Sequence, residues 1–306
     1  MEWDPTQFFR EDIPTTPLFA LVVTNQPLNE KALAVLRKHA RITVCADGGA
    51  NRFFEWAKSR GEESTDIPNT IIGDLDSIRP EILTHYRNLG VNIIHDDDQY
   101  STDLTKSLRY LRAHEREIIL SSTSPHQTKS NPEPGSTAPA SSKDDDKEED
   151  EQTLSILILG GLGGRVDQAF SQIHHLYLMN QENSKSNSSG SGTMYLISEE
   201  SITFILQPGK NTIHVPRTNC PQQPQEPAPE KKQEYLLEEN IGIIPLSGAE
   251  SITTSGLEWD VENWRTEIGG QISTSNHIRA EMVHVETGGA VLFTVELAGG
   301  LKRGSR

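Results

Sequence analysis

The sequence predicts an N-terminal Rossmann-like parallel α/β domain, residues 18–199, followed by a C-terminal antiparallel β-sandwich, residues 200–306. In the first part, short apolar runs alternate with amphipathic segments of roughly 10–15 residues, a pattern typical of βαβ units and a parallel sheet. Beyond about residue 199, short apolar runs follow one another closely, with Gly, Pro and Asn between them and no helical period. This second pattern favours an antiparallel sandwich. Residues 1–17 are predicted to form an N-terminal tail.

The elements of the first domain follow from this alternation. Strands are expected at residues 18–23, 42–46, 69–74, 91–95, 117–120, 154–161 and 194–198. Helices are expected at residues 29–39, 50–60, 80–89, 102–112 and 168–179. Trp56, His174 and His175 are interpreted as packing residues of their helices rather than as ligands. In the second domain, separate strands are expected for YLLEE and GIIPL, among others.

Three polar segments interrupt the folded pattern. Hydrophobic residues make up only 34% of the chain, or about 41% with its 23 glycines counted, whereas about 45–50% with glycine is typical of globular domains. The deficit lies in an acidic segment at 121–153, a polar loop at 180–193 and a Pro/Gln-rich segment at 217–233. Because such segments cannot bury enough apolar surface to offset the entropy of ordering, they are predicted to be disordered insertions.

Charge and cysteine usage narrow the classes of partner. The formal net charge is −16, from 28 Lys and Arg against 44 Asp and Glu, which disfavours a nucleic-acid partner because such binding needs clustered positive charge. Cys45 and Cys220 are too far apart in the sequence for a CxxC metal site. The chain shows neither a secretory signal nor an apolar stretch of about 20 residues. We therefore expect a soluble cytoplasmic protein with no membrane partner.

Four loops after predicted strands carry carboxylates, glycines or basic residues. They read DGGANR at 47–52, DLDS at 74–77, DDDQYSTDLTK at 96–106 and GGLGGRVDQ at 160–168. Ligands of parallel sheets bind beyond the carboxyl ends of the strands, where these loops are expected to meet. Each loop alone is equally compatible with helix capping, and the glycine loop is neither a dinucleotide fingerprint nor a Walker A loop. Their coincidence at one edge favours a shared ligand site.

The residue types in these loops suit phosphate chemistry with magnesium. Mg²⁺ prefers oxygen ligands and usually takes one or two carboxylates together with substrate phosphates, so Asp74, Asp76 and Asp103 are the candidate ligands. Glycines at a helix N-terminus present free N–H groups to phosphate oxygens. The candidates for contacting phosphate through such groups or through positive charge are Gly163, Gly164, Lys106 and Arg165.

Six short motifs then occur in a fixed order: DGGANR, GDLDS, QYSTDLTK, GGRVDQ, SGLEW and STSN. Together they resemble the thiamine pyrophosphokinase family of the eukaryotic type, from about residue 18 to residue 297. The resemblance implies Mg²⁺-dependent transfer of the pyrophosphoryl group of ATP to the hydroxyl of thiamine, giving thiamine diphosphate and AMP. It also implies a homodimer whose active sites lie between domains of both subunits.

The resemblance assigns roles to individual residues. Asp74, Asp76 and Asp103 would hold Mg²⁺ and, with Asp167, would be the catalytic residues. ATP and its phosphates would contact Asp47, Asn51, Arg52, Thr102, Lys106, Gly163, Gly164 and Arg165. Thiamine would be received by Gln99, Gln168, Trp259, Ser273, Ser275 and Asn276, with the residues of the β domain coming from the partner subunit.

Physical chemistry supports one of these assignments, and one position departs from the family pattern. Thiamine is cationic and aromatic, and a tryptophan face is a good platform for stacking and cation–π contact, although Trp259 as a core residue stays an open alternative. Tyr100 stands where many members carry a further aspartate. A neighbouring acid, Asp96, Asp97 or Asp98, would then take its place near the metal.

Two other functions remain open from the sequence. A haloacid-dehalogenase-like phosphatase would use the DLDS loop as its nucleophile and hydrolyse phosphate without an acceptor, but it leaves the β domain unexplained. A non-catalytic sensor of thiamine or nucleotide would retain the fold without turnover. Three carboxylates beside a polyphosphate argue against pure binding.

Overall fold

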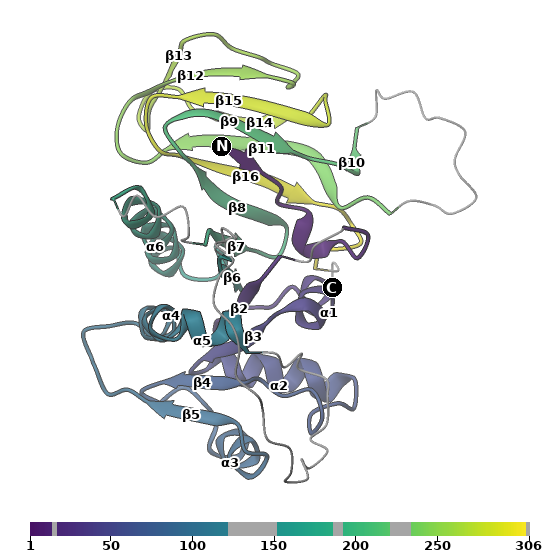
Figure 1. Cartoon of the computed structure of the whole chain (residues 1–306), viewed down its shortest axis with the longest axis vertical. Helices are drawn as coiled ribbons and strands as arrows, with labels where there is room; N and C mark the ends of the chain where they lie inside the picture. The colour runs from purple at the N-terminus through teal and green to yellow at the C-terminus, as the bar shows by residue number, and fades with distance from the viewer. Residues whose placement is uncertain (14–16, 122–151, 186–191, 221–233, 304–306) are drawn as a thin grey trace, which may run out of the picture.

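The computed structural model describes residues 1–13, 17–121, 152–185, 192–220 and 234–303. Within these ranges the strands form two sheets, one of eleven strands and one of five. The larger sheet begins in an α/β layer and continues into a β-sandwich layer, which Figure 1 places one above the other. This arrangement confirms the fold class predicted from the sequence.

The α/β layer is built on parallel strands in the order β5-β4-β3-β2-β6-β7. These are β2 (Phe19–Val23), β3 (Ile42–Ala46), β4 (Thr70–Gly73), β5 (Asn92–His95), β6 (Ser155–Leu159) and β7 (Met194–Ile197). The helices are α1 (Glu30–His39), α2 (Gly49–Ser59), α3 (Pro80–Asn88), α4 (Asp103–Ala113), α5 (Glu115–Leu120) and α6 (Val166–Lys185). Strand β2 lies between β3 and β6, so the loops after β2 and β6 diverge from a topological switch point.

The sandwich packs two sheets that share an apolar interior. Beyond β7, the larger sheet continues antiparallel through β8 (Ser201–Leu206), β16 (Val291–Leu297) and β11 (Leu237–Pro245), with β10 (Thr218–Asn219) and β14 (Ser273–His277) paired to β11. The smaller sheet orders β1 (Glu2–Trp3), β9 (Gly209–His214), β15 (Met282–Thr287), β12 (Glu250–Ser255) and β13 (Trp264–Thr266). Phe204 and Phe293 fill the interior, with ring centroids 5.4 Å apart.

The first residues belong to the core instead of forming a tail. Strand β1 pairs in parallel with β9, and a short 3₁₀ helix, η1 (Gln7–Phe9), follows it. Trp3 packs against Phe204, while Phe8 packs edge-on against Phe19 and Tyr195. These aromatic residues connect the sandwich and the α/β layer through one continuous apolar core. The apolar runs in these first residues are only one or two residues long, so the sequence did not indicate that they pack into the core.

Some predicted elements differ from the structure. Residues 117–120 form part of α5 rather than a strand, and the carbonyls of Ile118 and Ile119 at its end accept hydrogen bonds from Arg41; a four-residue apolar run does not distinguish strand from helix. YLLEE and GIIPL contribute to one long strand, β11, with a register shift near its middle.

The three polar segments are described only in part. Residues 180–185 continue α6, and residues 218–219 form β10. The rest of the three polar segments lies mostly outside the described residues.

Trp56 is buried against Phe53 with ring centroids 5.3 Å apart, as expected of a packing residue. Over the described ranges, no helix has both the length and the apolar character needed to cross a membrane.

Candidate active site

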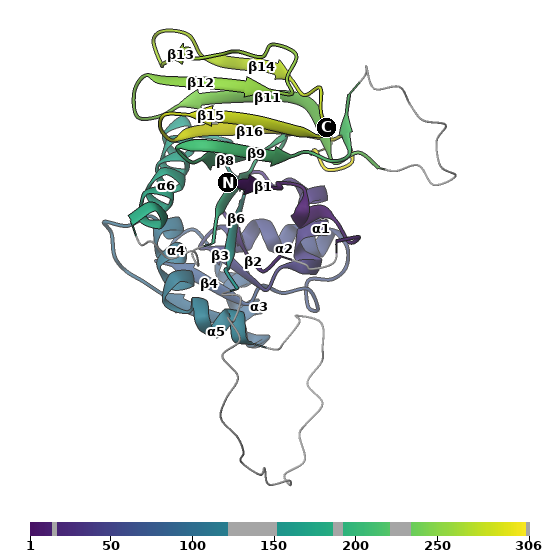
Figure 2. The ribbon, with the colours of Figure 1, turned by 45° about the horizontal axis from the view of Figure 1, so that its top comes forward.

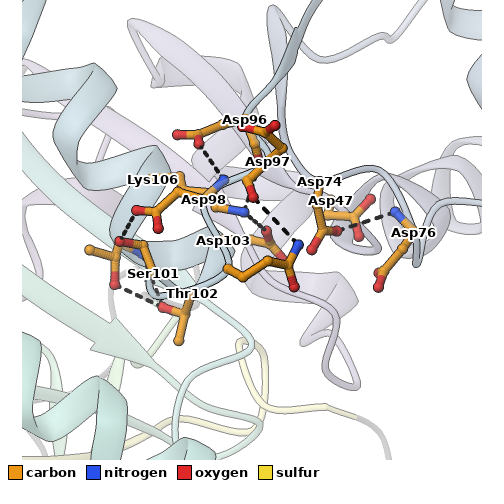
Figure 3. Close-up of polar contacts among 12 residues, drawn as sticks. Asp47, Asp74, Asp76, Asp96, Asp97, Asp98, Ser101, Thr102, Asp103 and Lys106 are labelled. Atoms are coloured by element: carbon orange, nitrogen blue, oxygen red, sulfur yellow. Dashed lines mark hydrogen bonds and ion pairs between the residues drawn. The ribbon is translucent and has the colours of Figure 1, made fainter.

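Three carboxylates from different loops meet at the carboxyl edge of the parallel strands (Figure 3). Asp47 follows β3, Asp74 follows β4, and Asp103 begins α4; one oxygen of each lies within 4.8 Å of the others. Gly73 makes this approach possible. A Cβ at position 73 would lie 2.5 Å from Cβ of Asp47 and 2.9 Å from Oδ1 of Asp103. The sequence prediction that loops of this edge converge therefore holds for these three residues.

Burial and mutual repulsion disfavour full ionisation of the carboxylate cluster. Removal from water raises the pKa of Asp47, and the charges of Asp103 and Asp74 raise it further, although N–H groups of the chain partly offset this. Burial also raises the pKa of Asp103, where nearby Lys106 acts in the opposite direction. An all-oxygen donor set with excess negative charge matches the preference of hard divalent cations.

Asp76 lies beside this cluster rather than within it. Its carboxylate accepts a hydrogen bond from Oγ of Ser77 at 2.8 Å and is exposed to solvent. Its N–H donates to Oδ1 of Asp74 at 3.3 Å. The structure thus brings together Asp74 and Asp103 with Asp47, a residue that the resemblance placed in the ATP cleft, and leaves Asp76 at the rim.

The loop between β5 and α4 is held mainly by its own side chains. Asp98 accepts hydrogen bonds from the N–H of Tyr100 at 2.9 Å and from Oγ of Ser101 at 2.6 Å, which lower its pKa with help from Arg109. Asp98 is therefore engaged in shaping the turn. Gln99 and Tyr100 are exposed, and Nε2 of Gln99 donates to the carbonyl of Asp97 at 3.5 Å.

Lys106 is the buried cation nearest to the cluster. Its Nζ donates to the carbonyl of Asp96 at 2.8 Å and lies 3.5 Å from Oδ1 of Asp103. Only 1% of its side chain is exposed. A buried ammonium beside a carboxylate can reach a phosphate oxygen that enters the same space.

The glycine loop after β6 presents backbone at the same edge. Gly164 has φ +69°, a conformation that other residues rarely adopt, and a Cβ there would lie 2.1 Å from Oε1 of Gln26, whose side chain would have to move. Arg165 and Asp167 form a two-bond ion pair at 2.5 and 3.1 Å, with 75% and 60% of their side chains exposed. This pairing lowers the pKa of Asp167. Gln168 is half-buried in the first turn of α6.

A hydrogen-bonded path between α4 and α6 was not expected from the sequence. Oγ1 of Thr102 caps α4 and lies 2.8 Å from Oγ1 of Thr105, which in turn lies 3.0 Å from Nε2 of His175. His175 is therefore more than a packing residue. A contact between helices some 70 residues apart has no signature in local sequence.

The loop after β2 was also missed. Oγ1 of Thr24 donates to the carbonyl of Gly160 at 3.3 Å, and Oδ1 of Asn25 accepts from Nε of Arg52 at 3.2 Å. This loop therefore touches both the glycine loop and α2. The same search after each strand would have found it, because β2 ends at the same edge as β3 and β6.

Four of the six residues expected to receive thiamine lie in the sandwich, namely Trp259, Ser273, Ser275 and Asn276. Trp259 is 57% exposed, with its ring centroid 5.1 Å from that of His277. The buried side chain of Asn276 accepts from the N–H of Trp259 at 3.2 Å and donates to its carbonyl at 3.0 Å. Trp259, Ser273 and Asn276 line a cavity of about 190 Å³. The exposure of Trp259 argues against the alternative of a core residue.

Ser275 lines a different, larger cavity. This cavity, of about 470 Å³, also touches Leu162 and Gly163 of the glycine loop. Figures 1 and 2 place β12 and β13, next to Trp259, at the end of the molecule opposite α3, whereas the carboxylates follow β3 and β4. One chain therefore presents Trp259 and the carboxylate cluster in different layers.

The fold and the site together are those of an enzyme. A carboxylate cluster and a glycine loop lie at the edge of a parallel sheet, and a β-sandwich follows in the same chain. Residues 33–187 match the family model "Thiamin pyrophosphokinase, catalytic domain", and residues 225–292 match "Thiamin pyrophosphokinase, vitamin B1 binding domain". The chain belongs to the thiamine pyrophosphokinase family.

Individual relatives agree with this membership. Thiamine pyrophosphokinase 1 of Oryza sativa subsp. japonica is 31% identical over 289 residues, covering 91% of this chain and 87% of the relative. The thiamine pyrophosphokinase of Saccharomyces cerevisiae is 30% identical and covers 84% of this chain and 77% of its own length. Among solved structures, thiamin pyrophosphokinase from Candida albicans superposes with a TM-score of 0.72 at 26% identity, covering 97% of this chain and 92% of that one.

Proposed function

We propose that this protein transfers the pyrophosphoryl group of ATP to the hydroxyl of thiamine, giving thiamine diphosphate and AMP. The observation that carries the proposal is the match to both the catalytic and the vitamin B1 binding domains in one chain, in the family order. The phosphatase alternative is not favoured, because it gives no role to the sandwich. The non-catalytic alternative is not favoured either, because the three carboxylates converge.

We further propose that Mg²⁺ is the metal of this enzyme and that Asp47, Asp74 and Asp103 hold it. The donor set supports this assignment, since three carboxylate oxygens within 4.8 Å of one another repel unless a cation lies between them. A bound Mg²⁺ would neutralise charge on the phosphates of ATP. Asp76, at the rim of the cluster, would complete the metal environment through water.

The chain's own residues would position the phosphates and accept a proton. Lys106 would contact a phosphate oxygen from within the site, while the N–H groups of Gly163 and Gly164 would bind oxygens at the start of α6. When ATP binds, Arg165 would break its ion pair with Asp167 and pair with a phosphate oxygen instead. Phosphoryl-type transfer depends chiefly on such positioning and charge stabilisation.

The proton of the thiamine hydroxyl needs a carboxylate acceptor late in the reaction. Asp76 and Asp167 are the two candidate carboxylates. Asp76 lies exposed beside the metal cluster, and its N–H donates to Oδ1 of Asp74, whereas Asp167 lies on the glycine loop beside Arg165. We therefore assign the acceptor role to Asp76. Gln99 and Gln168 would orient thiamine near it.

We also propose a homodimer in which Trp259, Ser273, Ser275 and Asn276 of one chain receive thiamine for the carboxylates of the other. The proposal is supported by the exposure of Trp259 and by its separate layer within one chain. A cytoplasmic location remains a prediction from the sequence.

Product analysis tests the reaction. Purified protein is incubated with thiamine, ATP and Mg²⁺, and the nucleotides are separated. AMP together with thiamine diphosphate is the expected result. Free phosphate with ADP would favour the phosphatase, and an absence of turnover would favour the non-catalytic sensor.

Mixing two inactive variants tests the shared site. In a dimer of Asp103→Asn with Trp259→Ala, one of the two sites combines the intact halves of both chains, so random pairing should restore about a quarter of the wild-type activity. If each site were formed within a single chain, mixing would restore nothing. Gel filtration of the wild-type protein supplies the oligomeric state independently.

A further inference from the structure

The segment that carries Asp74 holds an unfavourable backbone conformation. Leu75 has φ +63°, in the left-handed region that residues other than glycine and asparagine rarely adopt. Such a conformation is unfavourable for a leucine and persists only where the surroundings hold it. The position of Asp74 therefore depends on contacts outside the segment itself.

Residues at the start of α2 supply those contacts. Nδ2 of Asn51 donates to the carbonyl of Ser77 at 2.8 Å, and the N–H of Arg79 donates to Oδ1 of Asn51 at 3.0 Å. One turn earlier, the carboxylate of Asp47 accepts from the N–H groups of Ser77 and Ile78 at 2.9 and 3.1 Å. Two side chains four residues apart thus bind three consecutive residues of the segment.

We infer that Asn51 is a positioning residue that fixes residues 74–79 so that Asp74 stays beside Asp103 before the metal binds. This inference rests on the proposed function and changes the role that the resemblance gave to Asn51, which was contact with ATP. The Asn51 amide cannot turn toward a nucleotide without breaking both of its bonds to the segment. Asn51 acts on the metal through the backbone that carries Asp74.

The energetic consequence is a loss of metal affinity. Losing both hydrogen bonds of Asn51 removes contacts that hold the unfavourable backbone at Leu75 in place. The segment would then spend part of its time with Asp74 away from Asp103. We expect the dissociation constant of a divalent cation to rise about 5- to 10-fold, since about 1.4 kcal/mol corresponds to a factor of ten.

The test measures Mn²⁺ binding to the full chain by electron paramagnetic resonance, without ATP or thiamine. Asn51→Ala should raise the Mn²⁺ dissociation constant about 5- to 10-fold and shift the half-saturating Mg²⁺ concentration in the assay by the same factor. The KM for thiamine should stay within about 2-fold of the wild-type value. Asn51→Leu, of similar size, serves as the second variant in case the alanine variant folds poorly.

Glu55→Gln is the matched control. Glu55 lies one turn further along α2 and forms an exposed ion pair with the side chain of Arg79, without touching the backbone of the segment. Exposed ion pairs contribute little, so its Mn²⁺ affinity should match the wild-type affinity.

Three results would overturn the inference. Unchanged Mn²⁺ binding with a raised KM for ATP in both Asn51 variants would make Asn51 a direct ATP contact. A lower melting temperature with unchanged Mn²⁺ binding and kinetics would make its role merely structural. A wild-type protein that binds no Mn²⁺ would remove the metal site itself. Absence of AMP from the wild-type assay would instead contradict the proposed reaction, while the Mn²⁺ measurement would still decide the role of Asn51.

Discussion

The loops after β4 and after β6 reach the same edge of the sheet but are held very differently. The loop after β4 donates hydrogen bonds to the carboxylate of Asp47, accepts one from the amide of Asn51, and carries a carboxylate into a half-buried cluster. In the loop after β6, the guanidinium of Arg165 is largely exposed and pairs only with its near neighbour Asp167 among the described residues. Under the proposed function, this difference means that the metal-binding half of the site is preformed, whereas the phosphate-binding half is completed by substrate.

The largest expected effect comes from removing a carboxylate of the preformed half. Asp103→Asn or Asp74→Asn should lower kcat by about 100-fold or more, because metal-assisted charge stabilisation contributes several kcal/mol. The fold should stay intact, since each change also removes repulsion between neighbouring charges. Steady-state kinetics at saturating Mg²⁺, together with circular dichroism, measure both quantities. Turnover close to wild type in both variants would contradict the metal assignment.

A smaller effect is expected from crowding the preformed half without changing its charge. The added methyl group of Gly73→Ala would lie within 2.5 Å of Asp47 and 2.9 Å of Asp103, so the carboxylates must move apart. We expect kcat to fall about 10-fold and the free energy of unfolding to fall by about 1–3 kcal/mol. Gly61→Ala is a control for loss of a glycine, because a Cβ there meets nothing within 4 Å, although its φ of +70° adds some strain. If Gly73→Ala retained wild-type turnover, the closeness of the three carboxylates would not matter for the reaction.

Much of the preformed half could be predicted from the sequence. The alternation of apolar runs and helices located β3, β4 and α4, and the rule that ligands bind beyond the strand ends selected Asp74 and Asp103 correctly as neighbours. The resemblance assigned Asp47 to ATP, whereas in the structure its approach to the other two carboxylates depends on the left-handed backbone at residue 47, with φ +37°. Spacing along a chain does not reveal such a turn.

The rest of the site depends on contacts between distant segments. The bond from Thr105 to His175 joins two helices, and the role of Asn51 depends on the path of a loop 26 residues away in sequence. The burial of Trp3 and Phe8 likewise needs the sandwich as a partner. No local period or motif encodes these contacts between distant segments, so they could not be predicted from the sequence alone.

The pH dependence of stability gives a finer test of the preformed half. Burial raises the pKa of Asp47 and Asp103 in the folded protein, so the native state binds protons more tightly than the unfolded state. Their contribution to stability is present below the unfolded pKa of about 3.9 and is lost as the pH rises through the folded pKa. In metal-free protein, Asp103→Asn should therefore gain stability relative to wild type as the pH rises from about 4 to 7.

Urea unfolding of both proteins in the presence of a chelator, at several pH values, measures this difference. Groups that titrate identically in the wild-type protein and in Asp103→Asn contribute equally to both unfolding free energies, so their contributions cancel in the difference. A relative stability of Asp103→Asn that falls with rising pH would contradict the raised pKa. Saturating Mg²⁺ should stabilise the wild-type protein most at the highest pH, because the metal binds the ionised carboxylates.

The smallest effect on stability is expected in the loop after β6, and it separates the two halves of the site most directly. Arg165→Gln removes an ion pair whose partners are 75% and 60% exposed, and exposed pairs of this kind contribute little because solvent screens them. The melting temperature and the Mn²⁺ affinity should therefore match those of the wild-type protein. The KM for ATP should nevertheless rise about 10-fold, since a charged hydrogen bond to phosphate is worth roughly 1.5–3 kcal/mol. If Arg165→Gln lowered Mn²⁺ affinity without ATP, the glycine loop would belong to the preformed half, and the contrast between the two loops would fail.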